Sequence, residues 1–233
     1  MPGLRTARAL RVPPGRDDKI LTSWNALAIR GLADAARALD EPRFADSAAR
    51  ALDYLRKVHW RDGRLLATSR DGQAQLPAYL DDHALLIDAI LTLITVRFDA
   101  DALAFAAQLA DALLGRFEDR DHGGFFFTAS DHEALIHRSR SFTDDATPSG
   151  NAIAAQALQK LGWLLGEPRY LAAAERTLQA AWATVVGITA GTGAHGQCAG
   201  RSSRRARLRH PAWRTGCDRE LAPRTASVCG IRW

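Results

Sequence analysis

Apolar residues recur every three or four positions in six stretches of the chain, and this spacing predicts six amphipathic α-helices. The six stretches are residues 24–39, 44–58, 80–96, 102–117, 151–165 and 170–185. Short turns join the helices in pairs, which predicts three antiparallel helical hairpins. In the first helix, residues 24–39, the pattern places one apolar stripe on Trp24, Leu27, Ala28, Gly31, Leu32, Ala35, Ala36 and Leu39.

Three pairs of adjacent aspartates indicate that the hairpins are copies of one module. Each pair lies just before or at the start of the first helix of a hairpin, and the pairs are 64 and 63 residues apart. A turn of the sequence Glu-Pro-Arg-aromatic also recurs, at residues 41–44 and 167–170, which is an offset of twice 63. Two markers with the same period predict an internal structural repeat.

The first helix of the middle hairpin is apolar nearly all round, whereas its partner at residues 102–117 keeps a polar side. We interpret the first as an inner helix and the second as an outer one. Repeated inner-plus-outer hairpins are typical of an (α/α) toroid, because each inner helix is covered by its neighbours and by its own partner. The pattern therefore predicts an all-α fold, a partial (α/α) toroid of about three helical hairpins.

The two long connections, residues 59–79 and 118–148, contain turn signals. These are Asp-Gly at 62–63 and 71–72, and Gly-Gly at 123–124 beside a short extended run. Such signals predict small β-hairpins in the connecting loops. Three hairpins make half of a six-pair ring, so we expect the chain to need missing hairpins or self-association to cover exposed helix faces, and to be inactive alone.

Charge divides the chain into two regions. The formal net charge is +5, but residues 187–233 hold nine arginines against two acids, which leaves residues 1–186 slightly acidic. Helical periodicity stops at the same boundary. We assign residues 1–186 to the partial toroid and residues 187–233 to a basic tail that is disordered or non-native. A nucleic-acid-binding arm is the competing interpretation of this tail, and we base no nucleic-acid function on it.

Several classes of protein have no support in the sequence. No stretch reaches the roughly 18 apolar residues of a membrane helix, and the first residues lack the hydrophobic block of a secretory signal, so we expect a cytoplasmic protein without a membrane partner. The three cysteines are spaced by 19 and 12 residues, which matches no zinc or redox motif. We therefore predict no metal and no cofactor.

The aspartate pairs are the candidate catalytic residues. In a toroid all inner helices run the same way, so the pairs at their starts are predicted to converge at one mouth. Aspartate before a helix can cap it, and paired carboxylates can also serve glycoside hydrolysis as acid and as base or nucleophile. Both interpretations apply to Asp17, Asp18, Asp81, Asp82, Asp144 and Asp145.

Polar and aromatic neighbours of these pairs would suit a polyhydroxylated ligand. Trp24 can stack on a sugar face or lie in the core, and His83 can exchange a proton near neutral pH or form a structural hydrogen bond. Ser149 also fits an ordinary helix start. The candidate ligand-binding residues are Lys19, Trp24, Asn25, His83, Ser149 and Asn151.

Three runs of sequence resemble the signature runs of a known family, in the same order along the chain. They are DDKILTSWN at 17–25, GGFFFT at 123–128 and DATPSGN at 145–151. The family is the spermatogenesis-associated protein 20-like, thioredoxin-domain-containing family, whose bacterial members include YyaL. The resemblance implies the middle of a toroid similar to six-hairpin glycosidases and N-acylglucosamine 2-epimerases, without the thioredoxin-like domain that comes first in the family.

Two functions are compatible with these features. The first is a carbohydrate-binding or carbohydrate-processing toroid region, which as an enzyme would be glycoside hydrolase-like or sugar epimerase-like. The alternative is a noncatalytic helical scaffold whose concave face binds a protein or peptide and whose aspartates only cap helices.

Overall fold

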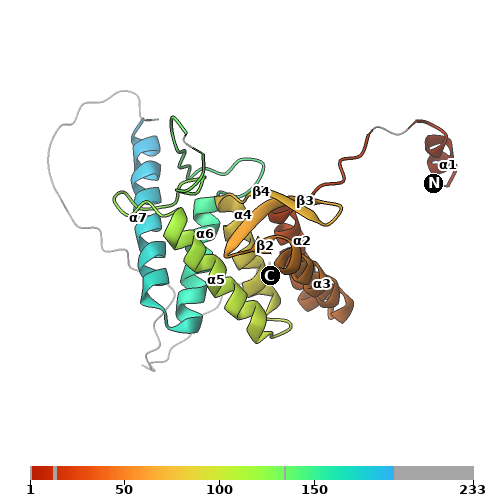
Figure 1. Cartoon of the computed structure of the whole chain (residues 1–233), viewed down its shortest axis with the longest axis horizontal. Helices are drawn as coiled ribbons and strands as arrows, with labels where there is room; N and C mark the ends of the chain where they lie inside the picture. The colour runs from red at the N-terminus through yellow and green to blue at the C-terminus, as the bar shows by residue number, and fades with distance from the viewer. Residues whose placement is uncertain (1, 13–14, 134, 192–233) are drawn as a thin grey trace, which may run out of the picture. The chain divides into compact units, whose positions relative to one another are not determined.

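The predicted helices are all present and pair into three hairpins. The computed structural model describes residues 2–12, 15–133 and 135–191. The hairpins are α2 (Thr22–Leu39) with α3 (Pro42–Val58), α4 (Leu80–Leu93) with α5 (Ala100–Arg116), and α6 (Gly150–Leu165) with α7 (Pro168–Gly191), and a short helix α1 (Pro2–Ala9) comes before them (Figure 1). Helix α7 continues past residue 186. Residues 192–233 lie outside the described residues, so the interpretation of the tail remains a prediction.

Helices α2, α4 and α6 form an inner row in which α4 packs against both neighbours, while α3, α5 and α7 each cover their own partner. Twelve of the fourteen residues of α4 are buried, which confirms the prediction of an inner helix. None of the helices in the described ranges combines the length and the apolar character needed to cross a membrane. The fold is an all-α partial (α/α) toroid.

The turns of the first and third hairpins have the same geometry. Asp40 and Gly166 both adopt a left-handed conformation, with φ of 53° and 69°. In each turn the next residue, Glu41 or Glu167, donates its backbone N–H to the carbonyl five residues earlier, at 3.1 and 3.0 Å. This pattern ends a helix and allows proline to begin the next one. The 126-residue offset in the sequence is thus a repeat in the structure.

The first long connection forms an antiparallel sheet, as predicted. Strands β2 (Trp60–Arg61), β3 (Arg64–Arg70) and β4 (Gln73–Pro77) follow one another, and β1 (Ile20–Leu21) also pairs with β3, with Leu21 opposite Thr68. Both Asp-Gly turns have positive φ at both residues, the conformation that two-residue hairpins favour. Figure 1 shows this sheet lying across one end of the helices.

The second long connection contradicts the expected β-hairpin. Within residues 118–133 and 135–148 the only strand-like pairing is a single bridge between Glu118 and Phe125. The side chain of Asn151 takes the place of a partner strand, because its Oδ1 accepts the N–H of Phe125 at 2.7 Å and its Nδ2 donates to the carbonyl of Phe125 at 3.0 Å. A side chain therefore satisfies the backbone groups that a ladder would otherwise pair.

The prediction of the buried face of α2 is also wrong, because the observed buried face is rotated about the helix axis relative to the predicted apolar stripe. The buried residues are Thr22, Ala26, Ile29, Ala33 and Ala36, and only Ala36 belongs to the predicted stripe. Three of these five residues are alanines, whose small side chains allow α2 to lie close to α4, the inner helix that it packs against. Leu27 and Leu32 of the predicted stripe pack partly against the core, but Trp24 is 65% exposed and an added Cβ at Gly31 would meet open space. Part of this second apolar stripe is therefore uncovered by the described residues.

Candidate functional site

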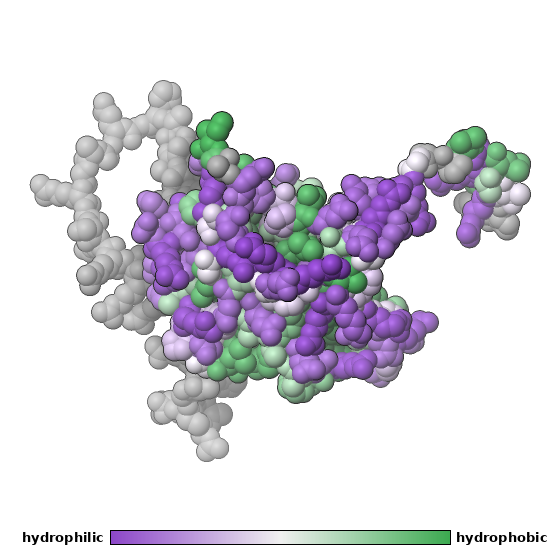
Figure 2. All heavy atoms as spheres, viewed as in Figure 1, coloured by the Kyte–Doolittle hydropathy of each residue, from purple (hydrophilic) through white to green (hydrophobic). Residues whose placement is uncertain are grey.

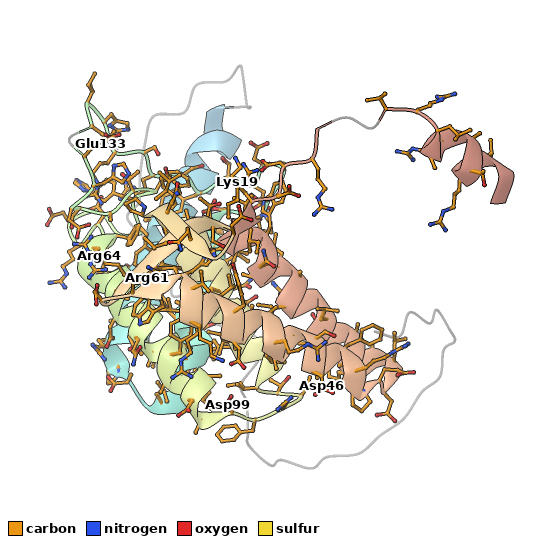
Figure 3. The ribbon with its side chains drawn as sticks, turned by 45° about the vertical axis from the view of Figure 1, so that its right-hand side comes forward. Lys19, Asp46, Arg61, Arg64, Asp99 and Glu133 are labelled. Carbon is orange, nitrogen blue, oxygen red and sulfur yellow. The ribbon has the colours of Figure 1, made fainter. Side chains whose placement is uncertain are left out.

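The three inner helices begin at the same end of the fold. Figure 3 shows Lys19, which precedes β1, and Glu133, in the second long connection, at the end opposite Asp46 and Asp99, where the outer helices α3 and α5 begin. Direct contacts join the starts of neighbouring inner helices. The carboxylate of Asp82 on α4 accepts the backbone N–H of Ser23 on α2 at 3.0 Å.

Asp82 caps two helices at once. Its second oxygen accepts the backbone N–H of Tyr79, the residue just before α4, at 2.9 Å, and the side chain is 5% exposed. Burial raises the pKa of Asp82 to about 6, although the hydrogen bonds from Tyr79 and Ser23 oppose this shift. With both oxygens bonded to backbone groups, the geometry of Asp82 favours the capping interpretation.

Asp81 points in a different direction, toward the start of α6. Its Oδ1 lies so close to Gly150 that a Cβ at this glycine would come within 2.0 Å of it. Burial raises the pKa of Asp81. Among the described residues no hydrogen-bond donor or cation pairs with its carboxyl group. A partly buried carboxyl group without a partner, with a raised pKa, is suited to hold and release a proton.

An open pocket of about 390 Å³ lies between the starts of α4 and α6. The second long connection forms one side of this pocket, since the backbone N–H of Leu80 donates to the carbonyl of Phe127 and that of Phe127 donates to the carbonyl of Ser139. Phe127 is 38% exposed and stacks on Tyr79, with ring centroids 4.8 Å apart. The lining consists of carboxyl, hydroxyl and apolar groups: Leu80, Asp81, Phe127, Ser139, Ser141, Thr143, Asp144, Asp145, Thr147, Pro148, Ser149 and Gly150.

The third aspartate pair belongs to this pocket. Asp144 Oδ1 accepts the backbone N–H of Ser149 at 2.9 Å, directly before α6, so this carboxylate supports the start of the helix while lining the cavity. The side chain of Asp145 is exposed. Ser149 is buried and its hydroxyl donates to the carbonyl of Ser141 at 3.4 Å. The structure thus brings Asp81, Asp144, Asp145 and Ser149 together.

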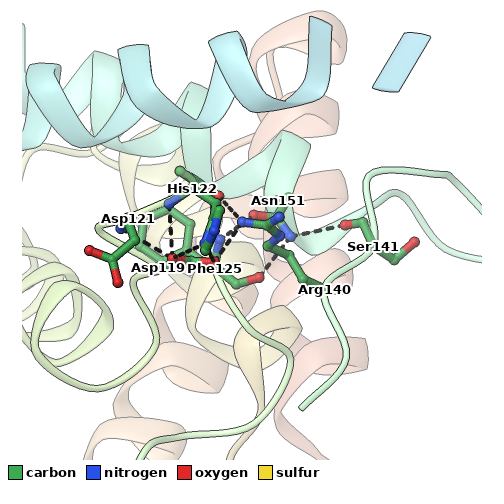
Figure 4. A network of polar contacts seen from close by, with 8 residues as sticks. Asp119, Asp121, His122, Phe125, Arg140, Ser141 and Asn151 are labelled. Atoms are coloured by element: carbon green, nitrogen blue, oxygen red, sulfur yellow. Dashed lines mark hydrogen bonds and ion pairs between the residues drawn. The ribbon is translucent and has the colours of Figure 1, made fainter. Parts of the chain in front are cut away.

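Asn151 holds the walls of the pocket rather than facing into it. Besides its two bonds to Phe125, it donates to the carbonyl of Ser141 at 2.9 Å, and the residue is 1% exposed (Figure 4). Both amide hydrogens and the amide oxygen are therefore used within the protein. This geometry supports a structural role for Asn151.

A buried carboxylate organises the rest of the loop. Asp119 accepts the backbone N–H groups of Asp121 and His122 and pairs with Arg140 at 2.7 Å (Figure 4). Arg140 also donates to the carbonyl of Gly123 at 2.6 Å. The guanidinium of Arg140 thereby fixes the extended segment that carries Ser139 and Ser141 into the pocket wall.

The first aspartate pair lies outside the pocket lining. Asp17 accepts the backbone N–H of Lys19 at 3.2 Å, which lowers the pKa of Asp17, and its side chain is 70% exposed. Asp18 forms an exposed pair with Arg16. Asn25 donates to the carbonyl of Leu21 at 2.8 Å. The indole of Trp24 is exposed, so it could stack on a ligand. Trp24 is not one of the residues that line the pocket between α4 and α6.

His83 lies in the core, where it is 2% exposed. Its Nδ1 bonds to the carbonyl of Tyr79 at 2.9 Å, its ring centroid is 4.9 Å from that of Phe117, and burial lowers the pKa of His83 to about 4. It borders a small separate cavity that Arg64 and Asp131 also line. The structure supports the structural interpretation of this histidine.

The sequence pattern did not single out an ionic cluster that joins the inner helices. Asp88 on α4 is 1% exposed and pairs with Arg30 on α2 at 2.7 Å and with Lys160 on α6 at 2.9 Å. It follows Asp81 by seven residues, so both lie on one face of α4, about 10 Å apart along its axis. The sequence did contain one signal for this cluster, because Asp88 is a charged residue within the apolar run of α4.

Phe127 and the hydroxyl groups of Ser139, Ser141 and Thr143 are pocket residues that sequence reasoning also missed. The Phe-rich run at 125–128 was a visible signal, but nothing in its spacing shows which ring faces the cavity. Within the described ranges, no group of three or more His, Cys, Asp or Glu side chains is arranged to hold a metal ion.

Sequence comparison identifies relatives that are several times longer. The chain is 29% identical over 175 residues to an uncharacterized protein of Caenorhabditis elegans, covering 72% of this chain and 24% of that protein. It is 28% identical over 177 residues to spermatogenesis-associated protein 20 of Homo sapiens, covering 71% of this chain and 22% of that protein. The chain thus spans about a quarter of the length of the curated relatives it matches. No protein-family model matches the chain.

Structure comparison finds toroid enzymes of low sequence identity. Cellobiose 2-epimerase of Spirochaeta thermophila has a TM-score of 0.58 at 19% identity, over 71% of this chain and 44% of that one. Unsaturated glucuronyl hydrolase of Bacillus sp. GL1 has a TM-score of 0.57 at 19% identity, over 73% and 48%.

A third neighbour is an α-1,6-mannanase of a Salegentibacter species, with a TM-score of 0.55 at 15% identity, over 69% of this chain and 46% of that one. Its structure is that of an inactive variant in which two consecutive aspartates are replaced by asparagine. Sequence and fold together confirm the predicted resemblance: the chain is similar in sequence to spermatogenesis-associated protein 20 and has the fold of part of an (α/α) toroid.

Proposed function

We propose that this chain is the carbohydrate-processing region of a longer toroid protein, and that the pocket between α4 and α6 binds the sugar. The observation that carries the proposal is the lining of this pocket, where three carboxyl groups and five hydroxyl groups surround one exposed aromatic face. Hydroxyl and carboxylate oxygens suit the many O–H groups of a sugar, and the ring of Phe127 suits its apolar face.

The chemistry of this site would be acid–base catalysis by Asp81. Its raised pKa favours the protonated form, which can protonate a glycosidic oxygen or take part in proton transfer beside a carbonyl. Asp145, exposed at the rim, would supply the second carboxyl group. The fold neighbours named for epimerase, hydrolase and mannanase activities support this class of reaction, and the inactive mannanase with two replaced aspartates supports carboxyl groups as its agents.

Calorimetric titration with glucose, mannose and cellobiose tests the binding. We expect Phe127→Ala to weaken binding about tenfold, because the stacking face is lost. Phe98→Ala is the matched control, since Phe98 is 71% exposed but lies in the connection between α4 and α5, outside the pocket lining. Equal effects of the two variants, or no binding of any sugar by the parent chain, would contradict the proposal.

Product analysis by chromatography tests the reaction, with cellobiose and mannobiose as substrates for the longest form of the protein that can be prepared. Asp81→Asn should abolish turnover without changing the melting temperature, and Asp71→Asn, at a carboxylate that is 92% exposed, should preserve it. Retained turnover in Asp81→Asn would overturn the catalytic role of Asp81, and no turnover by the parent protein, with Asp81→Asn changing only its stability, would instead support the noncatalytic scaffold.

A further inference from the structure

The wall of the pocket is built so that cations face away from it. Exposure alternates along residues 138–143: Ser139, Ser141 and Thr143 are exposed and line the cavity, whereas Arg138, Arg140 and Phe142 are half-buried on the opposite side. This alternation is that of an extended segment, whose successive side chains point to opposite faces.

Both guanidinium groups of this segment are tied to the protein behind the wall. Arg138 donates to the backbone carbonyls of Arg116 and Thr128 and lies over the ring of Phe126, 4.2 Å from its centroid. Arg140 pairs with Asp119 (Figure 4). These contacts prevent either arginine from turning toward the cavity without losing several hydrogen bonds.

The cavity side therefore carries the negative charge of Asp144 and Asp145 without compensation, because Asp81 serves as the protonated acid in the proposed reaction. The cavity lining includes three carboxyl groups and no Lys, Arg or His among the described residues. Asp144 accepts one neutral backbone N–H, while no described residue bonds to the carboxyl groups of Asp81 and Asp145. A metal ion is not indicated as the counter-charge, since the described acids form no metal-binding group.

We propose that this pocket selects sugars that carry a protonated primary amine, such as hexosamines, over neutral sugars, and that it rejects sugars with a carboxylate or phosphate group. This inference rests on the proposed function and specifies its substrate class. A protonated amine would donate to the free carboxylate of Asp145 and balance its charge, whereas a sugar carboxylate would add repulsion. The fold alone does not determine the charge of the preferred sugar, because similar folds occur in a cellobiose epimerase and in a glucuronyl hydrolase.

Calorimetric titration at about pH 6 with D-glucosamine, N-acetyl-D-glucosamine, D-glucose and D-glucuronate tests the selectivity. Glucosamine should bind about tenfold more tightly than glucose, as one additional close ion pair in a partly solvated pocket allows. N-acetylglucosamine should bind like glucose because its nitrogen is uncharged, and glucuronate should bind more weakly than either.

Two variants separate charge from shape. Asp145→Asn keeps the size of the side chain and should reduce the preference for glucosamine to about threefold or less, and high salt should do the same in the parent chain. Asp71→Asn, which removes the same charge from the turn between β3 and β4, should leave the preference intact.

The outcomes distinguish this inference from the proposed function. Equal binding of glucosamine and glucose would overturn the proposed selectivity but not the proposed function. Tight binding of glucuronate would have the same two consequences. Binding of no sugar would overturn both. A preference for glucosamine that survives Asp145→Asn together with high salt would show that the pocket charge is not its cause, and would overturn the inference.

Discussion

Asp82 and His83 are neighbours on α4 whose burial makes stability depend on pH in opposite directions. Burial raises the pKa of Asp82 from 3.8 to about 6, so the folded chain binds this proton more tightly than the unfolded chain. Stability from this group is present at low pH and is lost as the pH rises from about 4 to about 6. Burial lowers the pKa of His83 from 6.5 to about 4, so its contribution is lost as the pH falls through the same range.

The two effects are similar in size. Each group changes the free energy of unfolding by about 1.4 kcal/mol per pH unit within its window, or about 3 kcal/mol in total. Asp81 acts in the direction of Asp82, and His59, whose pKa burial also lowers, acts in the direction of His83. The parent chain should therefore show little net dependence between about pH 4 and pH 6.

Single variants should reveal the hidden slopes. In Asp82→Asn the free energy of unfolding should rise with pH more steeply than in the parent chain, by about 1.4 kcal/mol per unit, and in His83→Gln it should fall by about the same amount. Urea denaturation at several pH values, followed by tryptophan fluorescence, measures both slopes, with Asp71→Asn as the surface control. Variant slopes that match the parent slope would refute the burial-driven shifts.

Three further substitutions test the packing of the loops and the inner helices. Asn151→Ala should lower the free energy of unfolding by about 2–4 kcal/mol in urea, because the N–H and C=O of Phe125 lose their only side-chain partner among the described residues and the carbonyl of Ser141 loses one of two. Asn25→Ala should cost about 1 kcal/mol. Gly123→Ala should lower the melting temperature by several degrees more than Gly63→Ala, since both glycines have positive φ but only at Gly123 would a Cβ meet a backbone oxygen, at 2.5 Å; equal losses would contradict this close approach. Asp88→Asn should cost about 1–2 kcal/mol, a modest value because both of its cationic partners are partly exposed, and an unchanged melting temperature would show that the cluster adds nothing.

The helices and their repeat could be predicted because each depends on local sequence. Periodic apolar residues, a proline at helix starts and Asp-Gly turns act within a few residues of themselves, and the structure has all of these features. The buried face of α2 could not be predicted, because two of its stripes are apolar. The choice between Ala26 and Trp24 as the buried residue depends on how closely α4 approaches.

The candidate site was predictable only in part for the same reason. The aspartates at 81, 144 and 145 share a pocket because inner helices begin at one end, which the repeat implies. Asp82 and Asn151 are also polar residues near the starts of inner helices, but they do not face the pocket. Their polar atoms bond to backbone groups that are distant in sequence. Phe127 lines the pocket from a loop that has no periodic pattern, so the sequence does not show which way its side chain points.

Mapping the sugar on the chain by nuclear magnetic resonance tests most directly whether the pocket between α4 and α6 binds carbohydrate. Titration of the ¹⁵N-labelled chain with glucosamine and with glucose should shift the backbone amide signals of Asp81, Phe127 and residues 139–150. The signals of Asp46 and Asp99, at the opposite end of the fold, should stay in place (Figure 3). Hydrophobic side chains also reach the surface at that opposite end (Figure 2), so shifts confined to it would show nonspecific adhesion and would contradict the claim, as would the absence of any shift.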